Sequence, residues 1–159
     1  MATEIERKFL VDTTRWHPGS AGVLYRQGYL SASKQGVVRV RVAGERGYLT
    51  IKSATEGISR SEFEYPIPLA DAAAILDGLC VPPFIEKTRY REEFAGHIWE
   101  VDVFHGDNDG LVIAEIELAS ATEQVALPRW AATEVSDDPR YFNNNLAANP
   151  YRNWKQADG

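Results

Sequence analysis

Charged and apolar residues alternate along much of the chain with a period of two. Glu4-Ile5-Glu6, Arg39-Val40-Arg41 and Glu115-Ile116-Glu117 are examples. Successive side chains of a β-strand point to opposite faces, so each segment turns its charges to one side and mostly apolar groups to the other. This pattern predicts strands at residues 4–10, 24–30, 37–42, 47–53, 61–67, 84–94, 97–104 and 111–118.

The period changes in the middle of the chain. Apolar residues between positions 69 and 79 follow a helical stripe, and Pro82-Pro83 prevents its continuation. Shorter helices are expected at residues 12–17 and from Ser120, where Glu123 fits a capping box, to Pro128.

The C-terminal part of the chain predicts one more helix. Asp137-Asp138-Pro139 fits its start, with proline in the first turn, and it should end near residue 149. We expect residues 151–159 to form a frayed tail.

The predicted strands follow one another closely, which determines the expected fold. Neighbouring strands joined by short turns pair antiparallel, and closing the sheet removes its exposed edges. We therefore predict an α+β, mainly β fold: a closed eight-stranded antiparallel barrel with a few flanking helices, as a single domain over residues 1–150. A barrel of this size can hold side chains or one small ligand.

Two orientations of the charged rows fit the pattern. In the usual one the charges face water and the apolar rows fill the core. Two details favour an inward orientation: like charges recur two residues apart, where they repel, and the rows are rich in arginine, which suits bidentate phosphate contacts. A charged interior must be wet, internally paired or filled by a ligand, because burying an isolated ion is costly.

Composition narrows the function classes. The net charge of −6, from 17 basic and 23 acidic residues, argues against a general nucleic-acid binder. Cys80 is the single cysteine, so neither an intramolecular disulfide nor a cysteine zinc cluster is expected. Neither a signal peptide nor a membrane-spanning apolar run is visible. We expect a cytoplasmic protein that binds a small molecule and forms neither a stable nucleic-acid complex nor a membrane association. Whether it forms a homodimer is left open.

The charged rows also predict a chemistry. Clustered carboxylates without nearby histidine or cysteine favour hard cations, here Mg²⁺ or Mn²⁺. Rows of lysine and arginine opposite them favour phosphate oxygens. Together they predict a metal-bridged oligophosphate site.

Several segments resemble, in order, the motifs of the triphosphate tunnel metalloenzymes, or CYTH superfamily, of the small bacterial inorganic triphosphatase type. Glu4-Ile5-Glu6-Arg7-Lys8 is similar to the ExExK signature of that family, and the resemblance runs from residue 4 to about residue 148. The other matching motifs are Arg39-Val40-Arg41, Thr50-Ile51-Lys52, Glu62-Phe63-Glu64, Glu86-Lys87-Thr88-Arg89-Tyr90, Glu100-Val101-Asp102-Val103-Phe104 and Glu115-Ile116-Glu117-Leu118.

The resemblance implies a role for each charged row. The phosphate-binding residues it implies are Lys8, Arg39, Arg41, Lys52, Lys87 and Arg89. The acidic residues that would hold one or two metal ions or position water are Glu4, Glu6, Glu62, Glu64, Asp102, Glu115 and Glu117. It also implies catalytic roles for Lys52 and Tyr29, the latter as a candidate base. A strand tyrosine that only packs is an equal reading of Tyr29, because a phenol of pKa about 10 needs cationic neighbours to ionise near neutrality.

The expected function is metal-dependent hydrolysis of a linear triphosphate, with inorganic tripolyphosphate split to diphosphate and phosphate as the favoured reaction. Thiamine triphosphatase, nucleoside or RNA triphosphatase and class IV adenylyl cyclase are alternatives within the family. A non-catalytic polyphosphate- or nucleotide-binding module is an alternative of another class. A lipocalin-like binder would need an apolar interior instead.

Overall fold

The computed structural model describes residues 3–154 of the chain. Its strands are β1 (Thr3–Val11), β2 (Val23–Ala32), β3 (Gly36–Ala43), β4 (Arg46–Ser53), β5 (Ser59–Ile67), β6 (Ile85–Phe94), β7 (His97–Phe104), β8 (Val112–Glu117) and β9 (Ala131–Glu134). Its helices are α1 (Leu69–Gly78) and α2 (Asn143–Ala148), with three 3-10 turns, η1 (Gly106–Asn108), η2 (Pro139–Tyr141) and η3 (Tyr151–Asn153).

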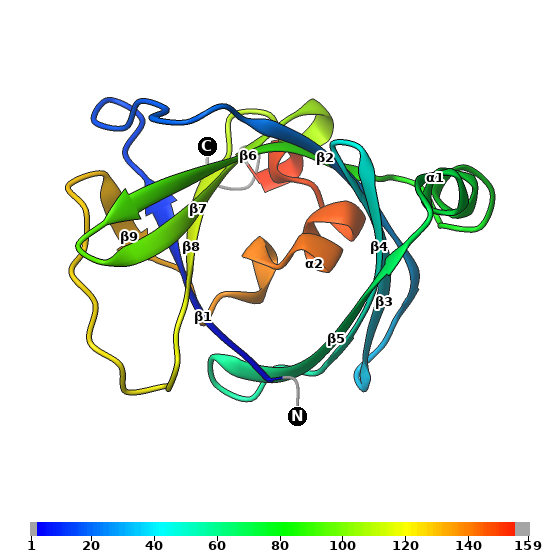
Figure 1. Ribbon diagram of the computed structural model, residues 1–159, viewed down its shortest axis with the longest axis horizontal. Coiled ribbons are helices and arrows are strands. Elements are labelled where there is room, and N and C mark those ends of the chain that lie inside the picture. Colours follow the sequence, from blue (N-terminus) through cyan, green and yellow to red (C-terminus); the bar gives the residue numbers. More distant parts are fainter. Residues whose placement is uncertain (1–2, 155–159) are drawn as a thin grey trace.

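The first eight strands close into an antiparallel barrel, as predicted (Figure 1). The strand order is β5-β4-β3-β2-β6-β7-β8-β1, and β1 closes the ring by pairing with β5. That closure is short, running from Thr3 opposite Ser61 to Ile5 opposite Ser59. Further along, β9 pairs with β1 at Phe9 and Val11, so the ninth strand extends the sheet outside the ring.

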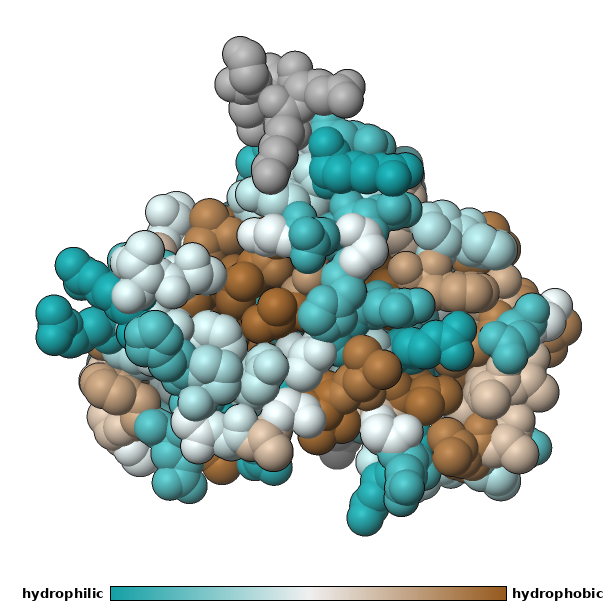
Figure 2. Space-filling view, turned by 90° about the horizontal axis from the view of Figure 1, so that it is seen from above, coloured by the Kyte–Doolittle hydropathy of each residue, from teal (hydrophilic) through white to brown (hydrophobic). Residues whose placement is uncertain are grey.

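Apolar side chains occupy the outside of the barrel. Helix α1 covers part of it, where Ala72 and Leu76 pack with Val40. On the β7–β8 side, Trp99 is fully buried in a cluster that also contains Trp130. Other outward apolar groups stay open to solvent, and Figure 2 shows hydrophobic patches between polar groups on one face of the molecule.

The inward rows change from charged to apolar at one end of the barrel. On β6 the inward row runs from Arg89 through Lys87 to Ile85, which is fully buried. At that end Ile85 belongs to a core cluster with Leu146 of α2 and Trp154. Figure 1 shows α2 lying within the ring of strands. The C-terminal segment therefore closes one end of the bore.

The C-terminal predictions need correction. The single helix predicted from residue 137 is two short elements, because Asp138 caps η2 and Phe142 then adopts an extended backbone (ψ 135°) before α2. Residues 151–153 form η3, and Trp154 after it is only 7% exposed against Tyr141 and Tyr151, so this part of the predicted tail is folded. The rest of the predicted tail, residues 155–159, lies outside the described residues.

Two other predicted helices are wrong. Residues 12–17 form only a turn, in which Asp12 accepts hydrogen bonds from Thr14. The segment after Ser120 is a loop, because the Glu123 carboxylate binds the backbone of Ala119 and the ring of His97. Within residues 3–154, no helix has the length and apolarity that crossing a membrane requires.

Candidate functional site

The bore holds a cavity of about 670 Å³ with a charged lining. Its lining includes every predicted site residue except Asp102, namely Glu4, Glu6, Lys8, Tyr29, Arg39, Arg41, Lys52, Glu62, Glu64, Lys87, Arg89, Glu115 and Glu117. The inward orientation of the charged rows is thus the one that the structure adopts. Arg7, on the opposite face of β1, forms an outside ion pair with Glu134 at 2.8 Å.

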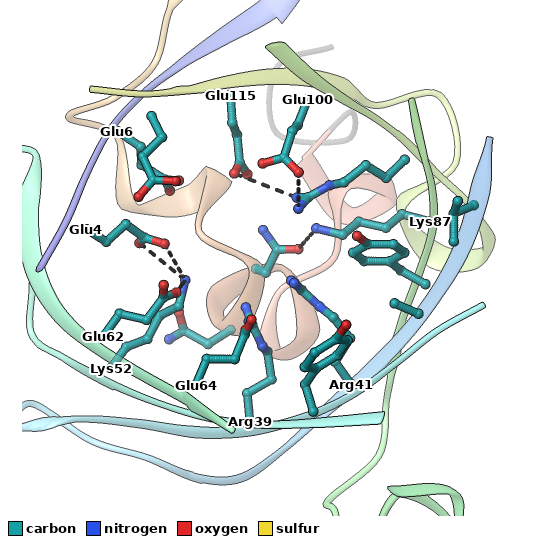
Figure 3. A pocket seen from close by; sticks show the side chains of 18 of the residues that line it. Glu4, Glu6, Arg39, Arg41, Lys52, Glu62, Glu64, Lys87, Glu100 and Glu115 are labelled. Atoms are coloured by element: carbon teal, nitrogen blue, oxygen red, sulfur yellow. Dashed lines mark hydrogen bonds and ion pairs between the residues drawn. The ribbon is translucent and has the colours of Figure 1, made fainter. Parts of the chain in front are cut away.

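The charges of the bore are divided between two sides (Figure 3). The acidic wall comprises five glutamates on β8, β1 and β5: Glu4, Glu6, Glu62, Glu115 and Glu117. The basic wall comprises four cations on β3 and β6: Arg39, Arg41, Lys87 and Arg89. Because these strands stand on opposite sides of the ring, a ligand in the bore would face both walls.

Two lysines are inserted among the acids. Lys8 Nζ lies 3.1 Å from Glu6 Oε1 and 2.9 Å from Glu115 Oε1. Lys52 Nζ lies 3.1 Å from carboxylate oxygens of both Glu4 and Glu62. Within residues 3–154 no three carboxylate, imidazole or thiol groups converge into a ready metal site. The lysines therefore act as internal counterions of the acidic wall.

The acidic wall still carries more negative charge than these lysines balance. Burial, with repulsion from Glu115, raises the pKa of Glu6 to about 7. Burial also raises the pKa of Glu117, and Glu4 and Glu100 add to the effect. Glu4 itself differs: burial opposes its ionisation, but Lys52 and Arg60 lower its pKa to about 2. A cation would be stabilised most beside Glu6 and Glu117.

The basic wall shows the reverse imbalance. Burial, with repulsion from Arg39 and Arg89, lowers the pKa of Arg41 to about 10. Burial lowers the pKa of Lys87 to about 7, although Asp102 opposes the shift. Arg39 is 5% exposed, and its buried Nε has no hydrogen-bond partner within residues 3–154. An unpaired buried guanidinium donor is suited to an anionic ligand.

Asp102 lies behind the basic wall. Its carboxylate is fully buried and accepts hydrogen bonds from Arg89 Nε at 2.7 Å and Arg89 Nη2 at 2.8 Å. Lys87 Nζ lies 2.7 Å from the same carboxylate. Because its oxygens already hold two cations and do not line the cavity, we leave Asp102 out of the proposed metal ligands.

Several polar residues in or beside the bore were not predicted as site residues, among them Arg60, Gln27 and Asn143. Arg60, whose Nε lies 3.0 Å from Glu4 Oε1, shares the inward parity of Glu62, and that parity was the available signal. Gln27 likewise shares the inward parity of Tyr29, and its amide nitrogen donates to the Tyr29 hydroxyl at 3.3 Å. Asn143 gave no comparable signal, because the helix that carries it was expected outside the barrel.

A closed antiparallel barrel with a bore lined by facing acidic and basic walls defines a tunnel fold. The sequence matches the CYTH domain over residues 2–151, and the chain belongs to this family. It is 51% identical over 156 residues to a protein of Acetivibrio thermocellus named inorganic triphosphatase, covering 98% of this chain and 100% of that protein. A protein of Nitrosomonas europaea with the same name is 37% identical over 150 residues, covering 91% and 97% of the two chains.

Solved structures agree with this assignment. A crystal structure described as an inorganic triphosphatase superposes with a TM-score of 0.66 at 34% identity, covering 92% of this chain and 95% of that one. A putative adenylate cyclase of Bacillus halodurans superposes with a TM-score of 0.60 at 17% identity, covering 76% and 84% of the chains. The second likeness shows the shared fold alone.

Proposed function

We propose that this protein is a metal-dependent triphosphatase that hydrolyses inorganic tripolyphosphate to diphosphate and phosphate. The observation that carries the proposal is the pair of facing walls in one enclosed bore. The two relatives named inorganic triphosphatase support it, because they match nearly the whole chain. Net burial of this many charges without a ligand is unfavourable, which a bound metal triphosphate would offset.

Phosphate oxygens would bind the basic wall. Arg39 supplies the unpaired Nε, and Arg41 forms no ion pair with a carboxylate of residues 3–154. Lys8 and Lys52 would bind phosphate from the other side, since each can exchange a carboxylate for a phosphate oxygen. The same residues are the phosphate ligands that the family resemblance implies.

The donor set of the acidic wall fits a hard divalent cation. It offers carboxylate oxygens alone, the ligands that Mg²⁺ and Mn²⁺ prefer. Burial and neighbouring carboxylates raise the pKa values of Glu6 and Glu117, so a cation beside these two carboxylates would be stabilised. We propose Glu4, Glu6, Glu115 and Glu117 as the principal ligands, with Glu62 and Glu64 as further acidic contacts. Bound Mg²⁺ or Mn²⁺ would neutralise phosphate charge and help to activate water.

The residues of the bore would then perform an in-line displacement. A water oxygen attacks a terminal phosphorus, the bond from that phosphorus to the bridging oxygen breaks, and diphosphate leaves. Lys52 is positioned to stabilise charge that develops on phosphate oxygens. Tyr29 is the candidate acceptor for the proton of the water, because it lines the cavity and pairs directly with Arg39 across the sheet.

Phosphate release from tripolyphosphate tests the proposal. We expect turnover with Mg²⁺ or Mn²⁺ that stops when EDTA is added. Parallel assays with ATP, thiamine triphosphate and long-chain polyphosphate rank the substrates, and tripolyphosphate should be preferred. Tight binding of tripolyphosphate without turnover under any metal would instead favour the non-catalytic binding module.

A further inference from the structure

Four side chains form a continuous hydrogen-bonded chain towards the closed end of the bore. Arg41 Nε donates to Gln27 Oε1 at 2.8 Å, and Lys87 Nζ donates to Asn143 Oδ1 at 2.8 Å. Between them, Gln27 Nε2 donates to Asn143 Oδ1 at 3.2 Å. Two cations of the basic wall are thus joined through two neutral amides, one from β2 and one from α2.

The orientation of both amides follows from the cations. A guanidinium and an ammonium group can only donate hydrogen bonds, so each must face an amide oxygen. This leaves the Gln27 nitrogen to donate to Asn143 and to the hydroxyl of Tyr29. Gln27 is fully buried, so no solvent competes for these bonds. The chain therefore has one consistent arrangement of donors and acceptors.

The two amides leave the charge of the cations that they bind uncancelled, unlike the carboxylates of the acidic wall. Lys8 and Lys52 are each held by two glutamates, which cancel their charge. An amide oxygen fixes a cation by a hydrogen bond but adds no negative charge. Arg41 has Gln27 as its hydrogen-bond partner and the ring of Tyr25 beside its guanidinium at 4.8 Å. Its positive charge stays available to a ligand.

We propose that Gln27 and Asn143 are positioning residues of the triphosphate site, which hold Arg41 and Lys87 in place without adding negative charge, so that the charge of Arg41 stays available to phosphate oxygens. This inference rests on the proposed function. It also gives α2 a part in the site beyond closing the bore, since Asn143 is its first residue. Without Asn143, Lys87 would keep Asp102 as its partner and be drawn towards the wall.

Steady-state kinetics with tripolyphosphate test this role. Asn143→Leu and Gln27→Met should each raise KM about tenfold, the effect of losing one hydrogen bond to a charged group, and change kcat less. Gln27→Glu should also raise KM, because it keeps the acceptor for Arg41 but cancels the charge. An unchanged KM in Asn143→Leu or in Gln27→Glu overturns the proposal.

Asn145→Ala is the matched control on the same helix. The Asn145 amide donates to the Pro139 carbonyl at 2.8 Å and lies outside the chain of four side chains. It should lower the melting temperature while leaving KM unchanged. If it raises KM as much as Asn143→Leu does, α2 acts only through its stability and the positioning role is wrong.

A double-mutant cycle and a binding measurement complete the test. If the amides act as one unit, Gln27→Met/Asn143→Leu should raise KM little more than either single change, whereas multiplied effects overturn the inference. If Gln27→Met does not fold, the two Asn variants decide. If the wild type binds tripolyphosphate in calorimetry without hydrolysing it, the proposed function fails. In that case, about tenfold weaker binding by Asn143→Leu still supports the positioning role. Unchanged binding by Asn143→Leu, or no binding by the wild type, refutes the positioning role.

Discussion

The acidic and basic walls of the bore are built by the same strand periodicity but are stabilised in different ways. On the acidic wall, Lys8 and Lys52 lie between pairs of glutamates. On the basic wall, the buried carboxylate of Asp102 serves both Lys87 and Arg89, and the amide oxygens of Gln27 and Asn143 accept from Arg41 and Lys87. Glu64 and Glu100 add one carboxylate each beside Arg39 and Arg89. One wall thus keeps surplus negative charge and the other keeps surplus positive charge. The difference shows a bore polarised across its width, suited to a ligand with both signs of charge.

Removing one acid should have the largest effect on activity. Glu117 lines the cavity, and its pKa is raised by burial and then by Glu4 and Glu100. Glu117→Gln should lower metal-dependent kcat about a hundredfold or more, because a metal ligand contributes several kcal/mol to the transition state. The melting temperature should stay unchanged or rise, since repulsion is relieved. Glu134→Gln, on the outside of the barrel, is the control; wild-type turnover in Glu117→Gln would remove Glu117 from the metal site.

Removing one cation from the basic wall should have a smaller effect, mainly on binding. Arg39→Gln deletes the guanidinium whose Nε has no partner within residues 3–154. We expect KM for tripolyphosphate to rise about tenfold, since a charge-assisted hydrogen bond is lost. Arg7→Gln, the control, removes an arginine that points out of the barrel and should leave KM unchanged. Equal KM values for Arg39→Gln and the wild type would contradict its phosphate contact.

Ligand binding should stabilise the protein by a modest amount. At a tripolyphosphate concentration one hundred times Kd, with Mg²⁺ present, the expected gain is about 2.7 kcal/mol. For a chain of this size that raises the melting temperature by about 5–10 °C. Differential scanning fluorimetry with and without EDTA measures the shift. The same shift in Arg41→Ala as in the wild type would show that the ligand does not use the basic wall.

The barrel could be predicted because its two-residue period is local in the sequence. A strand repeating charge at every second position, such as Arg39-Val40-Arg41, determines which residues share a face without any knowledge of the partner strand. Antiparallel pairing of neighbours then brings those faces together. This is why the lining of the cavity contains all but one of the predicted site residues.

Other features depended on contacts that are distant in the sequence. Asp102 has the correct parity, but its burial behind Lys87 and Arg89 follows from their side-chain geometry. The position of α2 was missed because the period of the strands does not show which segment covers the apolar end of the inward rows. Leu146 and Trp154 provide that cover over Ile85. The helix predicted after Ser120 is absent because Glu123 binds Ala119 and His97. At residues 12–17 the hydrogen bonds from Thr14 to Asp12 close a single turn, which no helix follows.

A crystal of the protein containing Mn²⁺ and tripolyphosphate provides the most direct test of the polarised bore. The anomalous difference map should place manganese among the carboxylates of the acidic wall, and the phosphate density should reach Arg39, Arg41 and Lys87. Manganese on the outer surface, or tripolyphosphate bound outside the barrel, would contradict the account.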